Sequence, residues 1–302
     1  MPINQVNLQP DLRLATALDA SLRMILSDMA SIRNTGAVLN LGSINGTGAD
    51  TSRIRFAGLG ATDAFSTIAP DGTAVTETAL VDASADIAVV RGALMREITD
   101  LATLTGYAND VNPASLAASM AASYERYFNQ QVAAAVSTLG TDVTAAAGLT
   151  VDDYYDAIFT LELASVPGPY FAMLAPVQVA NLQESLRAEG GAVQFMPATA
   201  EMLQIKGQGY VGDLLGVSIF KSSDVTTAAG DREGGMWGLG AFGYKTGTMQ
   251  TPIGAVVTSP NSEIVVEFNR NAAAGITEIV GNAYLGVGLI EDARGVGLNS
   301  DA

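Results

Sequence analysis

A stripe of apolar residues, mostly at steps of four, predicts one long amphipathic helix over residues 112–139. Asn112 provides its N-cap, Pro113 occupies the first helical position and Gly140 ends it. At 1.5 Å per residue, this helix would span roughly 40 Å. Its stripe consists of Leu116, Met120, Tyr124, Phe128, Val132, Val136 and Leu139.

Three other segments have the residue patterns typical of helices. Residues 11–33 carry apolar residues at steps of three and four, between an N-cap at Asp11 and a stop at Gly36. A further helix begins at Val151, with Thr150 as its cap. A strand, a proline and a helix follow one another in PYFAMLAPVQVANLQESLRAEGG, which starts at Pro169.

The remaining apolar segments read as strands. RIRFAGLG and TAVTETALV flank a turn at residues 70–72 and predict a long hairpin. This hairpin has too few apolar residues for a core of its own, so we expect it to rest on other structure. A short strand, GVSIFKSS, starts at Gly216, and the chain ends on EIVVEFNRN from Glu263 and NAYLGVGLIEDARGVGL from Asn282.

Composition allows two packed cores and indicates buried surfaces. The chain has 302 residues, of which 48% are hydrophobic and only 15% charged. Typical globular proteins carry roughly 25% charged residues, so much of this surface is expected to be covered by other subunits. The alternative is an ordinary protein rich in alanine and glycine.

Charge and missing residue types exclude several functions. A formal net charge of −16 with 15 basic residues argues against nucleic-acid binding, which needs lysine and arginine against phosphates. The absence of cysteine and histidine removes disulfides, the usual zinc ligands and a Ser-His-Asp triad. The N-terminus lacks a signal peptide, and prolines interrupt the uncharged stretch 163–183, so we expect a cytoplasmic product without membrane contact.

Three motifs could carry chemistry. Residues 238–243 match the dinucleotide fingerprint G-x-G-x-x-G, but no helix is predicted after them, so we interpret them as a glycine-rich strand. Asp152, Asp153 and Asp156 could bind a hard cation, but acidic residues also stabilise a helix N-terminus. Asp231 and Glu233 are interpreted as solvated loop residues.

An aromatic group completes the candidates and is assigned to core packing: Tyr124, Phe128, Tyr154, Tyr155 and Phe159. We therefore predict no catalytic residue, no cofactor site and no metal site, and the protein is not expected to be an enzyme.

The order of these blocks resembles the major capsid proteins of tailed double-stranded DNA bacteriophages, which share the Hong Kong 97-like fold. The resemblance covers nearly the whole chain and lies in block order, without a diagnostic short motif. It implies an α+β fold with an N-terminal arm, an extended β-hairpin loop, a peripheral domain built on a long spine helix, and an axial domain. The corresponding ranges are 1–52 for the arm, 53–92 for the extended loop, 93–140 and 262–302 for the peripheral domain, and 141–261 for the axial domain.

The resemblance implies a structural protein that assembles with itself, as pentamers and hexamers, into an icosahedral head enclosing phage DNA. Its location would be the virion, after assembly in the host cytoplasm, with scaffolding, portal and cement proteins as partners. Some relatives crosslink subunits through a lysine in the extended loop. Here the lysines are Lys206, Lys221 and Lys245, outside that loop.

Two alternatives remain open at this point. An encapsulin-type bacterial nanocompartment has the same fold and encloses a cargo enzyme. A nucleotide-dependent enzyme would use the glycine fingerprint at 238–243.

Overall fold

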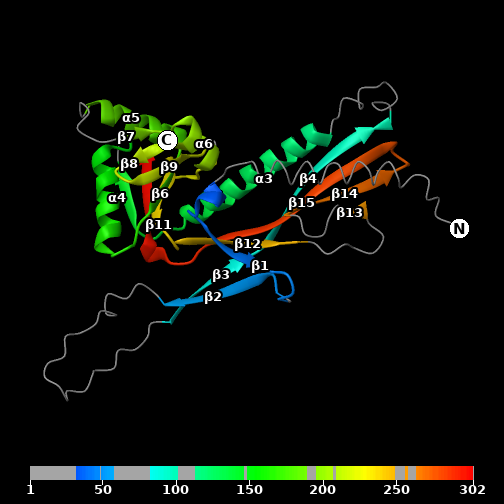
Figure 1. The fold of residues 1–302 in the computed structure, drawn as a ribbon, viewed down its shortest axis with the longest axis horizontal. Helices are drawn as coiled ribbons and strands as arrows, with labels where there is room; N and C mark the ends of the chain where they lie inside the picture. The colour runs from blue at the N-terminus through cyan, green and yellow to red at the C-terminus, as the bar shows by residue number, and fades with distance from the viewer. Residues whose placement is uncertain are drawn as a thin grey trace, which may run out of the picture.

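The chain folds around two β-sheets crossed by one long helix. A computed structural model describes residues 32–47, 49–57, 82–100, 113–145, 148–188, 195–206, 209–248, 256–257 and 263–301. Within these ranges the strands form a six-stranded sheet, an eight-stranded sheet and a two-stranded hairpin. The eight-stranded sheet and its helices form one compact part, the six-stranded sheet extends from it, and the hairpin projects separately (Figure 1).

The six-stranded sheet is organised around β15 (Ile276–Leu289). β4 (Val90–Thr99) pairs along one edge of β15, while β14 (Ile264–Asn271) and then β12 (Phe242–Gly247) pair along the other. The outer strands are β1 (Leu39–Ser43) beside β12 and β13 (Val256–Val257) beside β14.

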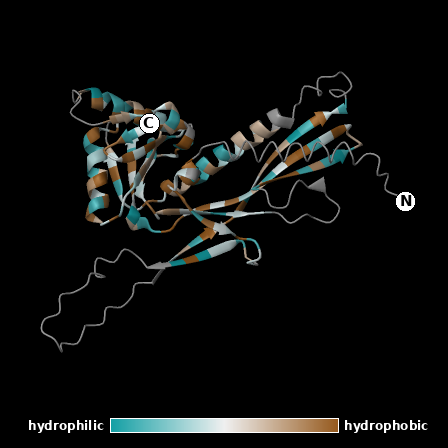
Figure 2. Ribbon diagram, in the orientation of Figure 1, coloured by the Kyte–Doolittle hydropathy of each residue, from teal (hydrophilic) through white to brown (hydrophobic). Residues whose placement is uncertain are grey.

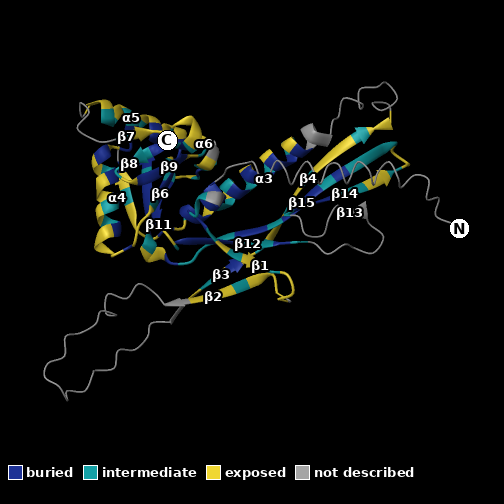
Figure 3. Cartoon of the chain, viewed as in Figure 1, coloured by how far each residue is buried: buried dark blue, intermediate teal, exposed yellow. Residues whose placement is uncertain are grey.

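The long helix α3 (Pro113–Val136) joins the two sheets. Its 24 residues span about 36 Å, and buried and exposed positions alternate along it (Figure 3). The first half packs Met120 and Tyr124 against the six-stranded sheet, and the second half packs Phe128 and Val132 into the core beside Trp237. The predicted helix is therefore confirmed over 113–136 and ends at Val136, before its predicted end at Leu139.

The predicted stripe is confirmed at six positions, all buried: Met120, Tyr124, Phe128, Val132, Val136 and Leu139. Leu139 lies just beyond the helix, which ends at Val136. The side chain of Leu116 and the predicted N-cap Asn112 lie outside the described residues, as does most of the helix predicted over 11–33. Only its last residues appear, in the short 3-10 helix η2 (Ile32–Thr35).

The eight-stranded sheet has the order β5-β16-β11-β6-β9-β8-β7, with β10 paired to β11. Helices α4 (Val151–Leu163) and α5 (Pro176–Ala188) pack on one face, whereas the end of α3 and α6 (Ala200–Lys206) cover the other. Brown positions in Figure 2 mark hydrophobic residues along both helices and strands. The strands are β5 (Asp142–Ala145), β16 (Gly295–Asp301), β11 (Asp231–Gly238), β6 (Tyr170–Leu174), β9 (Val217–Lys221), β8 (Tyr210–Leu214), β7 (Phe195–Pro197) and β10 (Thr227–Ala228).

The predicted strand-proline-helix block is confirmed as β6 followed by α5. Pro176 opens α5, where its missing N–H costs no hydrogen bond. Two residues on, the fully buried Gln178 accepts from Ala175 N (2.9 Å) and donates to the carbonyl oxygens of Arg232 (3.0 Å) and Leu298 (2.7 Å). One side chain thereby ties the start of α5 to β11 and β16.

The outgoing strand predicted for the hairpin is confirmed over 53–57, whereas the returning strand predicted over 73–81 lies outside the described residues. β2 (Thr51–Ala57) pairs antiparallel with β3 (Asp82–Ala88) over seven residue pairs. The predicted turn at 70–72 lies outside the described residues.

Strand pairing divides the molecule differently from the predicted domain ranges. β12 falls within 141–261 but pairs in the six-stranded sheet, and β16 falls within 262–302 but pairs in the eight-stranded sheet. Sequence order cannot reveal such exchanges, because each strand is placed by partners far away in the chain. The domain boundaries themselves stay a prediction.

Candidate assembly surfaces

The base of the β2–β3 hairpin is seated on glycines of β15. Ile87 of β3 is buried, and a Cβ added to Gly288 would lie only 2.9 Å from its Cγ1. A Cβ on Gly286 would overlap the carbonyl group of Ala88. β3 therefore crosses β15 at direct backbone contact, which fixes the direction in which the hairpin leaves the molecule.

Exposed apolar side chains form a stripe on α4. Tyr155, Phe159 and Leu163 are 45%, 58% and 70% exposed, and their spacing of four aligns them on one helix face. The prediction that Tyr155 and Phe159 are core residues is wrong, since Tyr154 and Leu161 occupy the face that packs on the sheet. Successive residues of an α-helix point about 100° apart, and on α4 the face toward the sheet takes Tyr154 and leaves Tyr155 exposed.

A second exposed apolar group lies on α6 and β7. Ile205, Met196 and Leu203 are 71%, 52% and 38% exposed. Met202 of α6 packs against the core cluster on one face of the eight-stranded sheet, whereas Tyr154 of α4 belongs to the cluster on the other. The same sheet thus presents exposed apolar side chains on two opposite sides.

The strand β4 forms an edge of the six-stranded sheet. Within the described part of the chain it pairs with β15 alone, so its outer backbone groups face away from the sheet. Val90 and Met95 on this strand are 54% and 49% exposed. An open edge with apolar side chains is suited to pairing with another chain.

A buried charged group anchors the residues around η2. Arg33 lies between Glu125 of α3, with Nη2 to Oε1 at 3.3 Å, and Glu263, and its guanidinium stacks 5.6 Å from the ring centroid of Tyr124. Burial lowers the pKa of Arg33, but the two carboxylates raise it more, so the guanidinium stays charged. This part of the predicted arm is therefore fixed to both α3 and the start of β14.

The glycine fingerprint forms a turn between the sheets. Gly238 ends β11, Ala241 N donates to its carbonyl oxygen at 3.3 Å, and Phe242 begins β12. A Cβ on Gly243 would lie 2.7 Å from Ile290 Cδ1. The glycines permit close packing, and the motif lacks the helix N-terminus that holds a pyrophosphate in dinucleotide sites.

The acidic group at the start of α4 caps the helix. Asp153 N donates to Thr150 Oγ1 at 3.3 Å, and Thr150 N donates to Asp153 Oδ2 at 2.9 Å, which completes a capping box. Asp152 and Asp156 are exposed. Within the described residues, no group of three or more acidic, His or Cys side chains could hold a metal ion.

The prediction that Asp231 and Glu233 lie in a solvated loop is wrong. Both belong to β11, and Glu233 accepts a hydrogen bond from Thr226 Oγ1 at 2.7 Å. The short run of charged residues led to the prediction of a loop, but β11 pairs with β16 on one side and with β6 on the other.

The lysines expected outside the hairpin lie in strands and a helix. Lys245 Nζ donates to Ser52 Oγ of β2 at 2.7 Å, so it reaches the base of the hairpin. Lys206 Nζ lies 3.2 Å from Asp213 Oδ1 and 4.4 Å from the ring centroid of Tyr210. Among the helices of the described ranges, none is long and apolar enough to cross a membrane.

Solved structures resemble this chain over nearly its full length. The capsid of Ralstonia phage GP4 matches with a TM-score of 0.59 at 9% identity, over 91% of this chain and 90% of that one. The capsid of an empty GTA particle gives 0.58 at 13% identity, over 90% of each chain. The chain has the Hong Kong 97-like capsid fold.

An encapsulin complex also resembles this chain. The holo-SrpI encapsulin complex from Synechococcus elongatus PCC 7942 matches with a TM-score of 0.56 at 12% identity, over 92% of this chain and 88% of that one. No protein-family model and no curated protein sequence matches the chain. Identities this low establish the capsid fold and nothing finer.

Several residues of these surfaces carry no signal in the sequence. In the sequence, Gly286 and Gly288 are simply two glycines of a predicted strand. The structure shows that they leave space for β3 to cross β15. Arg33 and Glu263 are 230 positions apart, so no local pattern connects them. Ile205 and Leu163 could have been identified only from the faces of their helices.

Proposed function

We propose that this protein is a phage major capsid protein, which assembles with itself into the icosahedral shell around phage DNA. The chain resembles capsid chains over 90% and 91% of its length. The observation that carries the proposal beyond the fold is the presence of exposed apolar groups on two opposite sides of one sheet, at Phe159 on α4 and Ile205 on α6. Surfaces of this kind bury themselves in contacts with neighbours, and contacts on opposite sides can be repeated by symmetry.

In this proposal the subunits form pentamers and hexamers, and the product is located in the virion after assembly in the host cytoplasm. The projecting hairpin and the predicted arm act between subunits. Scaffolding, portal and cement proteins are the expected partners. The shell wall does not bind DNA specifically, because a net charge of −16 repels phosphates, and no catalytic role is proposed for any residue.

The α4 stripe gives a direct test. Replacing Tyr155, Phe159 and Leu163 by serine should leave the fold intact, because these side chains do not contribute to the core, but should prevent particle formation. Size-exclusion chromatography and circular dichroism report assembly and fold. The matched control replaces buried Tyr154 by serine, which should unfold the chain. Normal particles from the triple variant would contradict the proposal.

An encapsulin-type compartment is the second candidate, favoured by the match to the holo-SrpI encapsulin complex. The content of particles made in the natural host separates the two. Nuclease-protected DNA supports the phage capsid, and an enclosed enzyme supports the compartment.

A further inference from the structure

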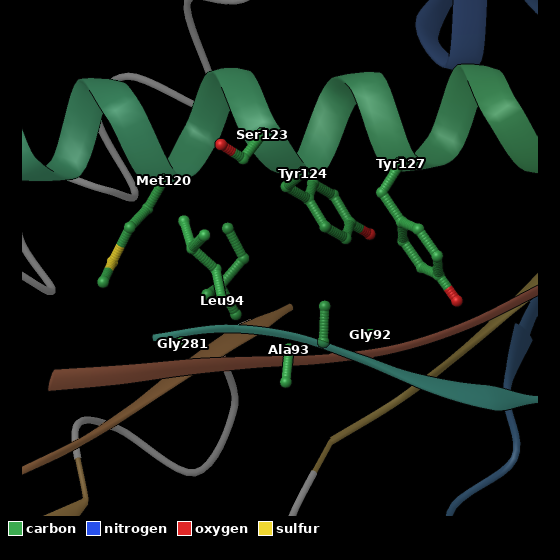
Figure 4. A pocket seen from close by; sticks show the side chains of 10 residues that line it. Gly92, Ala93, Leu94, Met120, Ser123, Tyr124, Tyr127 and Gly281 are labelled. Carbon is green, nitrogen blue, oxygen red and sulfur yellow. The ribbon is translucent and has the colours of Figure 1, made fainter. Parts of the chain in front are cut away.

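A half-open cavity of about 150 Å³ lies between α3 and the six-stranded sheet. Met120, Tyr124 and Tyr127 project from α3 toward the strands, and Leu94 of β4 faces them (Figure 4). Ile264 of β14 completes the wall. The cavity, called the α3 cavity below, is thus bounded by the helix on one side and by three strands on the other.

The space exists because glycines form part of the floor. A Cβ on Gly281 would lie 3.6 Å from Met120 Sδ and 3.7 Å from Ile264 Cγ2, which is ordinary van der Waals contact. One methyl group therefore fits over Gly281, and a larger side chain would enter the cavity. At the other end the ring of Tyr127 lies directly on Gly92, where an added Cβ would be 2.8 Å from Tyr127 Cε1.

The lining determines which ligand could bind. None of its ten residues is charged. Burial raises the pKa of Tyr124 and of Tyr127, so both hydroxyls are neutral at pH 7. An ion would lose its hydration without gaining a counter-charge. An apolar cavity of about 150 Å³ can accommodate a molecule the size of benzene.

We propose that the α3 cavity is a binding site for a neutral molecule with a single aromatic ring. Such a molecule would contact both α3 and the sheet, and would therefore stabilise the packing of the helix on the sheet by binding only the folded state. This proposal is independent of the proposed function, because it depends on the cavity and not on contacts between subunits.

Saturation-transfer NMR with benzene and benzoate tests the proposal on the full chain. Benzene should receive magnetisation from the protein and raise its unfolding temperature, and benzoate should do neither. Gly281→Val should weaken benzene binding by at least about tenfold, which corresponds to about 1.4 kcal/mol. The matched control Ala122→Val, on the exposed side of α3, should leave binding unchanged.

A second variant, which is expected to gain binding, keeps the proposal testable even if Gly281→Val misfolds. Met120→Ala enlarges the cavity and should allow naphthalene, with two rings, to bind where the unmodified chain binds it weakly. The proposal is overturned if benzene does not bind the unmodified chain, if benzoate binds as well as benzene, or if Gly281→Val and Ala122→Val bind benzene equally.

Discussion

Gly286 and Gly288 determine where the hairpin leaves the body of the molecule. The backbone of Ala88 occupies the place where a side chain at position 286 would stand, and Ile87 covers Gly288. A backbone cannot move aside as the end of a flexible side chain can. The direction of the hairpin thus depends on two positions of β15 being glycine.

Gly286→Ala should therefore destabilise the chain by about 1–3 kcal/mol, the usual cost of overpacking. Denaturant unfolding of the unassembled subunit measures this difference. Gly281→Ala, on the same strand, is the matched control, because its Cβ meets Met120 at an ordinary 3.6 Å. Equal stability of the two variants would show that β3 does not rest on Gly286.

The carboxyl group of Asp213 is expected to make the stability of the chain depend on pH. Burial raises the pKa of its carboxyl group, but hydrogen bonds from Ser218, Tyr210 and Lys206 outweigh burial and lower it below the usual value. The folded state therefore binds a proton less readily than the unfolded state. The resulting stabilisation is complete above the unfolded pKa of about 3.9 and is lost as the pH falls through the lower folded pKa.

Asp213→Asn should cost about 1–2 kcal/mol at pH 7, and its deficit against the unmodified chain should shrink below about pH 4. Unfolding measured across pH 3–7 follows both effects. Asp86→Asn, which removes the exposed ion pair with Arg53, is the control and should change stability far less. A deficit for Asp213→Asn that does not vary with pH would refute this electrostatic role.

Among the described elements, the hairpin strands β2 and β3 bury few of their described side chains. The described strands β2 and β3 pair with each other, and Ile87 is the buried residue that anchors them on β15. A two-stranded ribbon is marginal on its own. The hairpin is thus suited to contacts with another subunit.

Replacing residues 58–81 by a short glycine-serine linker keeps every described strand pair of the hairpin. The variant should retain its circular dichroism spectrum and unfolding temperature, because no described core residue is removed, but it should not form closed shells. Electron microscopy shows the particles. A variant that unfolds would place residues 58–81 in the core, and one that closes normal shells would remove their role in assembly.

Elements with local signals were predicted well from the sequence. The long helix α3, the Thr150 cap and the Pro176 start of α5 each depend on residues within a few positions of one another. Predictions failed where the outcome depends on which face of a helix is buried, or on a strand partner far away in the sequence. Phe159 lies on the outer face of α4, and Asp231 belongs to a strand paired with the C-terminal β16.

At the scale of the whole molecule, two sheets share one helix, and their strands are exchanged along the chain. The chain passes from the eight-stranded sheet into the six-stranded sheet at β12 and returns to the eight-stranded sheet at β16. Exposed apolar groups on opposite sides of the compact part, together with a projecting hairpin, provide contacts in several directions. Repetition of such contacts by symmetry can build a closed shell.

We predict a shell held together without covalent bonds between subunits. The chain has no cysteine, and Lys206 and Lys245 are held by hydrogen bonds to Asp213 and Ser52. Particles boiled in detergent should run as monomers of about 31 kDa on a denaturing gel. A ladder of covalent oligomers would contradict this, and Lys245, at the base of the hairpin, would then be the first donor to replace by arginine.

The measurement that tests the central claim most directly is electron microscopy of the purified, full-length chain. We predict closed, icosahedral particles of uniform size, in which three-dimensional reconstruction shows pentamers and hexamers of this subunit. A protein that stays monomeric or forms only small oligomers, under conditions where the spectrum shows it to be folded, would contradict the account.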